Sequence, residues 1–303
     1  MYGGLMNKKT LAYILTIIQT IIVALSVVFV KIALEMTNAY DQLTFRFFLA
    51  LISVFLVNPF MKNKFKLSKQ MFKDLMPLAI FFPVLFLLLQ GLGLMYSSAT
   101  EAGIIQALSP IFAIILSSIM LGEKTNFIQK ICIVLSVLGV VYMTYMGSKI
   151  SISFNPKGTL LLLLSSFVLS FNIVLPRKLK DKYDSHEMTS FITLIGFVVF
   201  SLISIFYHMK NADAFNFMLL ANPKFFLAMF MLGCIATYFT SWTNNFSLAH
   251  LEVSKVSVFT NLCPIISLLG AMAFLGEAVH SYHIIGMIIT LVGVIGTNYF
   301  ANK

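Results

Sequence analysis

Charged side chains are scarce in this 303-residue chain, where Asp, Glu, Lys and Arg together make up only 11% of the residues. Hydrophobic residues make up 59%, and the mean hydropathy is +0.93. A soluble globule of this length needs more polar surface than such a composition supplies. The scarcity of charge therefore excludes a soluble domain and indicates an integral membrane protein.

Motifs for enzyme chemistry and for ATP use are also missing. The sequence contains no Walker loop, no GxSxG and no HExxH. The three cysteines, Cys132, Cys234 and Cys263, fall inside apolar runs without a CxxC spacing, so neither a disulfide nor a metal site is expected. We expect no enzyme activity and no cofactor.

Apolar runs, in contrast, fill nearly the whole chain. Runs of about 20 residues are long enough to cross a hydrocarbon core of roughly 30 Å. Ten such runs cover residues 10–31, 39–60, 74–95, 98–121, 126–146, 157–177, 187–208, 225–247, 252–275 and 281–300. The sequence therefore predicts an all-α polytopic membrane protein with ten transmembrane helices.

The basic residues predict an orientation. With the N-terminus inside, fifteen of the 21 Lys and Arg residues fall on the cytoplasmic side and six on the outer side. The net charge of +10 is then mostly this asymmetry plus attraction to anionic lipid, so no nucleic-acid partner is expected. We expect a multi-pass protein of a bacterial plasma membrane with both termini in the cytoplasm.

The chain also repeats itself. The stretch "LSPIFAIILSSIMLGE" begins at Leu108, and "LCPIISLLGAMAFLGE" begins at Leu262, 154 positions later. Each half holds five spans, and an odd number turns the second half upside down relative to the first. Two inverted five-helix repeats, 10–146 and 157–300, are typical of secondary transporters that bind solute between the halves.

A proline interrupts one span in each half. Pro110 and Pro264 remove the hydrogen bonds that the carbonyls of Gln106 and Thr260 would accept, and in lipid those carbonyls need other partners. Both helices have a face of small or polar residues. In the first helix this face includes Gly103 and Gln106. Two interpretations stay open, close helix packing through small residues and lining of a central cavity. We expect both prolines to act as hinges.

These residues resemble a known family. The pattern of a proline, a Leu-Gly-Glu end, a polar residue and Gly-Val resembles the EamA repeat of the drug/metabolite transporter superfamily. It reads Pro110, Leu121, Gly122, Glu123, Gln129, Gly139 and Val140, and again Pro264, Leu275, Gly276, Glu277, His283, Gly293 and Val294. The stretches 44–52, with Arg46, and 172–180 are similar to further helices of such proteins. The resemblance implies a ten-helix carrier of small metabolites, although His283 replaces the more usual glutamine.

Arg46 is the costliest side chain inside a span, because a charge in the hydrocarbon core costs about 2.5 kcal/mol or more unless it is paired. One interpretation is that it reaches the outer interface or pairs with Asp41 or Glu35. The other is that it anchors an anionic group or forms half of an outer gate.

Four further charged residues lie near span ends. Glu101 follows Ser98 with the spacing of a capping box, and Lys255 occupies the equivalent position in the second half. Both are candidates for gating or coupling, with helix capping and the positive-inside rule as the competing interpretations. We expect Glu123 and Glu277 to cap backbone amides.

The eighth span is the most polar, and its polar face is expected to point inward. The expected cavity residues are Arg46, Gln90, Gln106, Asn172, Tyr238, Ser241, Trp242, Asn244, Asn245, Thr260 and Asn261, while Trp242 could instead belong to an aromatic belt. The five histidines fall at span ends, where solvated or capping roles are expected.

The sequence thus predicts a secondary-active or facilitative transporter of small polar metabolites that works by alternating access, with export as one possible direction. The alternative is a membrane-embedded enzyme or a structural subunit of a membrane complex. The expected partners are a small metabolite, the lipid bilayer and, as an open option, a second copy of the chain.

Overall fold

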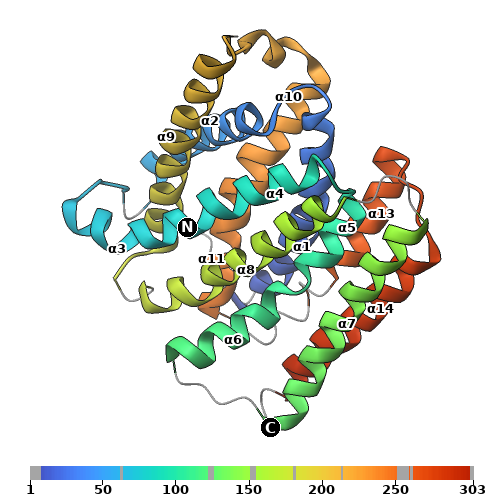
Figure 1. Cartoon of the computed structure of the whole chain (residues 1–303). Coiled ribbons are helices and arrows are strands. Elements are labelled where there is room, and N and C mark those ends of the chain that lie inside the picture. The colour runs from blue at the N-terminus through green and yellow to red at the C-terminus, as the bar shows by residue number, and fades with distance from the viewer. Residues whose placement is uncertain are drawn as a thin grey trace.

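The computed structural model describes residues 8–61, 64–121, 126–150, 155–179, 182–212, 214–250, 259 and 262–300. Its regular structure in these residues is helical (Figure 1). The α-helices are α1 (Lys8–Leu34), α2 (Ala39–Val57), α3 (Lys69–Ala79), α4 (Phe86–Leu94), α5 (Ala99–Gln106), α6 (Ser109–Leu121), α7 (Phe127–Ile150), α8 (Pro156–Leu179), α9 (Ser185–Asn211), α10 (Pro223–Phe230), α11 (Thr240–His250), α13 (Cys263–Leu275) and α14 (Ser281–Phe300). Shorter segments are η1 (Asn58–Phe60), η2 (Ile80–Leu85), η3 (Phe217–Ala221) and η4 (Met231–Phe239). The prediction of an all-α fold is confirmed for this part of the chain.

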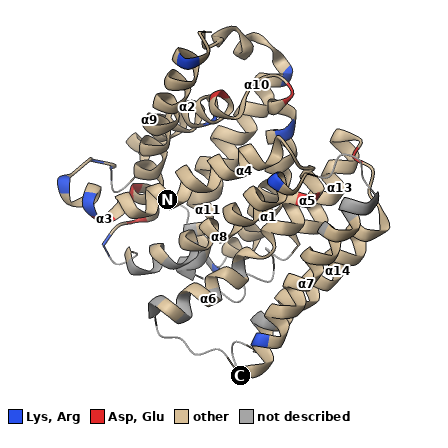
Figure 2. Ribbon diagram, viewed as in Figure 1, with Lys and Arg blue, Asp and Glu red and all other residues tan. Residues whose placement is uncertain are grey.

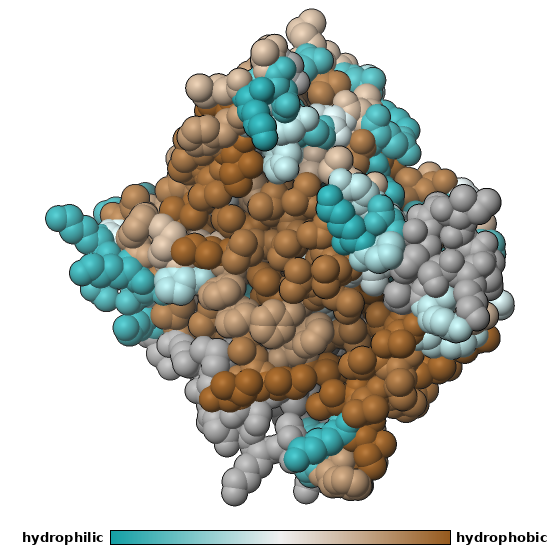
Figure 3. Space-filling view, viewed as in Figure 1, coloured by the Kyte–Doolittle hydropathy of each residue, from teal (hydrophilic) through white to brown (hydrophobic). Residues whose placement is uncertain are grey.

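Five helical segments of the described residues are long and apolar enough to cross a membrane. They are Lys9–Leu34, Ala39–Phe60, Lys69–Leu94, Ser185–Asn211 and Pro223–Asn244, and shorter apolar helices cover Phe127–Met143, Cys263–Leu275 and Ser281–Gly296. Hydrophobic residues dominate the centre of the molecular face in Figure 3, and hydrophilic ones gather toward its edges. Figure 2 shows Lys, Arg, Asp and Glu mostly near helix ends and in connecting segments. The membrane setting inferred from composition is therefore supported by where these side chains lie.

Two long helical segments are interrupted by π-helical stretches. The first, η2, contains Phe82 in an extended conformation (φ −133°, ψ 118°) followed by Pro83. The second, η4, includes Thr237, whose hydroxyl donates to the carbonyl of Leu232 five residues earlier (2.7 Å). Since π-helical segments often occur at functional sites, η2 and η4 are candidates for local bending. The two stretches are equivalent in the repeat, because η2 moved 154 positions along the chain covers residues 234–239, inside η4.

The sequence predicted that Pro110 and Pro264 interrupt continuous spans, whereas the structure places each proline at the start of a helix. Helix α5 ends at Gln106, a turn follows at Ala107 and Leu108, and α6 starts at Ser109 just before Pro110. Helix α13 likewise begins at Cys263, with Pro264 in its first turn. Proline is tolerated there because the first amides of a helix have no partner within it. The hydroxyl of Ser166 in α8 donates to the carbonyl of Ile105 (3.1 Å), so the α5–α6 break receives a side-chain partner.

Helix packing follows the repeat. Helices α2 and α9 pack together, as do α5 and α13, and α7 and α14. Helix α1 packs on η4, α11 and α13, and α8 packs on η2, α4, α5 and α6. Each neighbour of α1 in the second half thus matches a neighbour of α8 in the first.

The α7–α14 pair, side by side at the lower right of Figure 1, shows this reciprocity at the level of residues. A Cβ added at Gly139 would lie 2.5 Å from Thr290 Oγ1 and 2.8 Å from the Gly286 carbonyl. A Cβ at Gly293 would lie 2.5 Å from the Ser136 amide and 2.6 Å from the Cys132 carbonyl. The residues of the two contact sets correspond, each 154 positions apart. Only glycine fits this close approach of two backbones.

The N-termini of these two helices are capped alike. Asn126 and Gln129 exchange bonds between side-chain oxygen and backbone amide, both at 2.8 Å. At the equivalent place the His280 amide donates to Nδ1 of His283 (3.2 Å). The capping role expected for a histidine at a span end is confirmed for His283, which does here what glutamine does in the first half.

Candidate functional site

Arg46 lies buried in α2, with 5% of its surface exposed. Its Nε donates to the hydroxyl of Thr237 in η4 at 2.8 Å. A Cβ at Gly233 would lie 2.5 Å from the Arg46 carbonyl, so the absence of a side chain there lets η4 approach α2. Arg46 is therefore enclosed by protein, and its depth relative to the outer interface stays a prediction.

Pairing of Arg46 with Asp41 or Glu35 is not found. Both carboxylate oxygens of Asp41 lie 3.0 Å from Nε2 of His208, and Ser204 donates to the same carboxylate. Glu35 instead pairs with Lys224 at 3.2 Å. Arg46 therefore directs its charge toward the polar segment η4 rather than toward a carboxylate of its own helix end.

A buried histidine, His186, contacts Tyr238, the residue that follows Thr237. The sequence did not predict this role for it. His186 Nδ1 is hydrogen-bonded to the Tyr238 hydroxyl (3.1 Å), and its Nε2 to Oδ1 of Asn58 (3.1 Å). His186 is 3% exposed and Tyr238 6%. A solvated or capping role, expected for all five histidines, is therefore wrong for His186. His208, in the last turn of α9, binds the Asp41 carboxylate. We name Arg46, Thr237, Tyr238, His186 and Asn58 the polar junction of α2, η1, α9 and η4.

One predicted cavity residue, Asn244, is bonded between α1 and α11. Gln19 Nε2 donates to Oδ1 of Asn244 (3.0 Å), and the Thr243 hydroxyl donates to Oε1 of Gln19 (3.3 Å). Asn244 is thus held by a helix from the other half of the chain. The inward orientation expected for the polar face of the eighth span is met by Tyr238 and Asn244.

The remaining predicted residues are spread over several helices. Gln90 is buried in α4, Asn172 is half-buried in α8, and Ser241 and Trp242 are half-buried in α11. The Trp242 ring stacks on Phe246 of the same helix, with centroids 5.9 Å apart. Asn245 lies in α11, and Pro110 lies in α6. Four other predicted residues lie outside the described part of the chain: Glu123, Lys255, Thr260 and Asn261.

Two buried amides lack partners among the described residues. Gln42 in α2 is 0% exposed, and neither its Nε2 nor its Oε1 has a hydrogen-bond partner. Gln106, the last residue of α5, has a buried Nε2 in the same situation. An unsatisfied buried polar group costs about 1–3 kcal/mol, so each such group in a native protein calls for an explanation, such as a bound water or ligand. Gln42 went unnoticed in the sequence, although a glutamine in an apolar span is itself a signal.

The two halves of the chain are joined by hydrogen bonds at the start of α5. The carboxylate of Glu277, after α13, accepts from the amides of Ala99 (2.8 Å) and Thr100 (3.1 Å) and from the Thr100 hydroxyl (2.8 Å). Ser98 and Glu101 complete a capping box on the same turn, which confirms the capping interpretation of Glu101. Glu277 caps amides as expected, but those of α5 in the first half, not those of the helix that follows it.

Next to these hydrogen bonds, the faces of α5 and α13 that carry small residues are in contact. A Cβ at Gly103 would lie 2.6 Å from the Ser267 Cβ. The packing interpretation of these small residues is confirmed here. We name the Glu277–α5 bonds and the Gly103–Ser267 contact the Glu277 clamp.

The comparisons with known proteins agree with this architecture. Residues 10–145 and 156–299 each match the model of the EamA-like transporter family. The chain is 34% identical over 298 residues to a protein named "Uncharacterized transporter YcxC" from Bacillus subtilis, covering 98% of this chain and 96% of that one. An "Uncharacterized transporter" from Archaeoglobus fulgidus is 26% identical over 291 residues, covering 95% and 97%.

One solved crystal structure shares the fold, with a TM-score of 0.67 at 13% identity, covering 97% of this chain and 98% of the other. Together with the duplicated family match and the 34% identity to a relative of nearly the same length, the resemblance inferred from the two proline motifs is confirmed. The chain belongs to the EamA-like transporter family.

Proposed function

We propose that this protein is a bacterial plasma-membrane carrier that moves small polar organic solutes by alternating access of two inverted five-helix repeats. The observation that carries the proposal is the reciprocal packing of the halves, in which α1 and α8 contact equivalent partners and Gly139 and Gly293 make equivalent contacts. Inverted repeats of this kind place the solute at their interface and exchange access by moving against each other.

The polar junction and the unpaired amides supply a chemical basis for solute binding. Arg46 offers a fixed positive charge, Tyr238 a hydroxyl, and Gln42 and Gln106 unused hydrogen-bonding atoms. Such a set suits a solute with hydroxyl, amide or carboxylate groups. Facilitated or exchange transport is proposed, with export as one possible direction.

The ten-span topology, with both termini in the cytoplasm, forms part of the proposal. The clamp between Glu277 and Thr100 and the pair of Lys224 with Glu35 join segments expected on the outer side. The Tyr183 hydroxyl donates to Asp74 (3.0 Å), and the Asn126 amide group donates to the Phe300 carbonyl (2.8 Å). These bonds join segments expected on the cytoplasmic side, which supports the proposed arrangement.

Within this scheme the Glu277 clamp is the outer gate. It ties the end of α13 in the second half to α5 in the first, so opening toward the outside requires three hydrogen bonds to a carboxylate to break. Charge-assisted bonds of this type are individually strong, about 1.5–3 kcal/mol each. Opening is then expected to depend on solute or on weakening of the clamp.

The cargo can be sought by a thermal-shift screen of metabolites on the detergent-purified protein, because a ligand of the folded state raises the melting temperature. A hit is then tested for counterflow in proteoliposomes. We expect protein-dependent exchange of the labelled solute. Stabilising solutes that never cross the bilayer, in liposomes containing folded protein, would contradict the carrier function.

The gate can be tested without knowing the cargo. In a variant with the three native cysteines replaced by serine, Ser267→Cys reports on the clamp, and a membrane-impermeant maleimide is added to intact cells. Glu277→Gln should speed its labelling from outside, whereas Ser136→Cys, buried between α7 and α14, should stay unlabelled in both backgrounds. Equal labelling of Ser267→Cys with and without the Glu277→Gln substitution would remove the clamp from the gating mechanism.

A further inference from the structure

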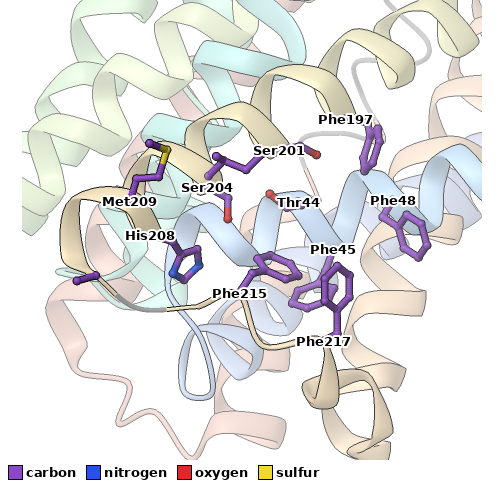
Figure 4. Close-up of a pocket in the computed structure, with 12 residues that line it drawn as sticks. Thr44, Phe45, Phe48, Phe197, Ser201, Ser204, His208, Met209, Phe215 and Phe217 are labelled. Atoms are coloured by element: carbon purple, nitrogen blue, oxygen red, sulfur yellow. The ribbon is translucent and has the colours of Figure 1, made fainter.

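A groove lies between α2 and α9, and its lining residues differ from those of the polar junction. Its volume is about 630 Å³, and it is bounded by Thr44, Phe45, Phe48, Phe197, Ser201, Ser204, Ile205, His208, Met209, Ala212, Phe215 and Phe217 (Figure 4). None of the residues predicted for the solute cavity belongs to this set. The groove therefore needs an occupant other than the proposed solute.

The shape of the groove follows one face of α9. Its α9 residues run from Phe197 to Ala212 at helical spacing, and with a rise of 1.5 Å per residue this face is about 22 Å long. Helix α2 forms the opposite wall through Thr44, Phe45 and Phe48. The lining therefore runs along two neighbouring helices for a length that suits an extended hydrocarbon chain.

The polarity of the groove changes along its length. Phe48 and Phe197 lie at one end, with ring centroids 6.1 Å apart. At the other end is His208, bonded to the buried carboxylate of Asp41, near the C-terminus of α9. A ligand that matches this gradient has a hydrocarbon part and a polar end.

The groove is also open on the apolar outside of the molecule. Ile205 is 54% exposed, Met209 73% and Phe217 68%. In a bilayer Ile205 and Met209 face lipid, since α9 is long and apolar enough to span it. Lipid chains therefore have direct access to the groove.

We infer that this groove holds one acyl chain of a membrane phospholipid, with the chain packed along Phe48 and Phe197 and the headgroup at the His208 end. The site is independent of the solute that the protein carries. A resident lipid here would join α2 of the first half to α9 of the second, and so couple the bilayer to the contact between the repeats.

Photolabelling tests this inference on the full chain in nanodiscs. The discs contain a trace of a phospholipid with a diazirine in one acyl chain, and labelled peptides are mapped by mass spectrometry after irradiation. We expect labels to concentrate on peptides containing residues 44–48 and 197–209, several-fold above those on the lipid-facing surface of α7. Labels spread evenly over α7, α9 and α14 would overturn the site.

A filling variant supplies the control. Ser201 lines the groove, and its hydroxyl is buried without a partner among the described residues, so Ser201→Phe occupies the groove without breaking a described bond. Leu202→Phe, at a neighbouring position that is 49% exposed, adds bulk toward lipid and leaves the groove free. We expect groove labelling to fall several-fold in Ser201→Phe and to persist in Leu202→Phe.

Ser201→Leu fills less of the space and should give an intermediate reduction, which provides a second variant if phenylalanine impairs folding. Unchanged labelling in a folded Ser201→Leu or Ser201→Phe protein would overturn the inference. So would chemical crosslinks between two protein copies through Ile205 or Phe217 that exclude the photolipid, because a second copy would then be the occupant.

Discussion

The two halves of this chain share their backbone devices but not their polar chemistry. Both have a π-helical interruption, a helix that restarts at a proline, and a glycine at the α7–α14 crossing. Yet Tyr238 and Thr237, which form the polar junction, correspond to Val84 and Pro83 in the first half. The comparison teaches that packing and bending are duplicated whereas the polar groups are not. Under the proposed mechanism both halves move, and an asymmetric solute needs only one set of polar groups.

The duplicated packing is most severely tested at the two crossing glycines. Gly139→Leu and Gly293→Leu each place a side chain where the partner backbone lies within 3 Å, so both should lose most of the folded protein. Overpacking typically costs about 1–3 kcal/mol, and a clash with backbone should reach or exceed that range. Monodisperse yield and melting temperature after detergent extraction measure the effect, with Leu138→Ala, on the exposed face of α7, as the control. A large difference between the two glycines would break the symmetry of the pair.

The asymmetric chemistry is tested at Arg46. Arg46→Met removes a buried charge, so the melting temperature should hold or rise, while stabilisation by any solute found in the screen should be lost. Thr237→Val keeps the charge but removes the oxygen that accepts from Nε, and should lower stability. Solute binding that survives Arg46→Met would move the binding site away from the polar junction.

The two prolines test whether duplicated bends serve transport. Pro110→Ala and Pro264→Ala allow the α5–α6 turn and the start of α13 to become continuous helix. We expect both variants to fold and both to slow solute counterflow, by similar factors. Normal counterflow in both would place the hinge elsewhere, for instance in η2 and η4.

An equivalent pair of amides sharpens the contrast between the halves. Asn244→Leu leaves the buried amide of Gln19 without its acceptor and should cost about 1–3 kcal/mol. Gln90→Leu, at the equivalent position in α4, replaces a buried amide by an apolar side chain of similar size and should cost less. Chemical or thermal unfolding of the two variants gives the comparison, and equal losses would argue for equivalent roles.

The smallest effect is expected at the helix caps. Gln129→Ala and His283→Ala each remove one side-chain bond to the backbone amide that precedes α7 or α14. Loss of a cap costs roughly 0.5–2 kcal/mol, and the two losses should be similar. His283→Gln should retain most of the stability, since glutamine performs the same task in the first half.

Much of this architecture was determined by the sequence itself. The all-helical class follows from apolar runs, the repeat from two proline motifs, and the Ser98–Glu101 cap from residue types at a fixed spacing. All of these depend on neighbours in sequence or on a period, so local rules suffice to predict them.

The partners of the polar side chains were decided only by the tertiary structure. Arg46 and Thr237 are 191 positions apart, and Glu277 and Ala99 are 178 apart. Their contacts depend on how η4 crosses α2 and how α13 approaches α5, which small residues such as Gly233 and Gly103 permit. No spacing rule encodes those crossings, so the sequence suggested Asp41 for Arg46 and missed His186. Which helices meet, and at what height, follows from the packing of all faces together.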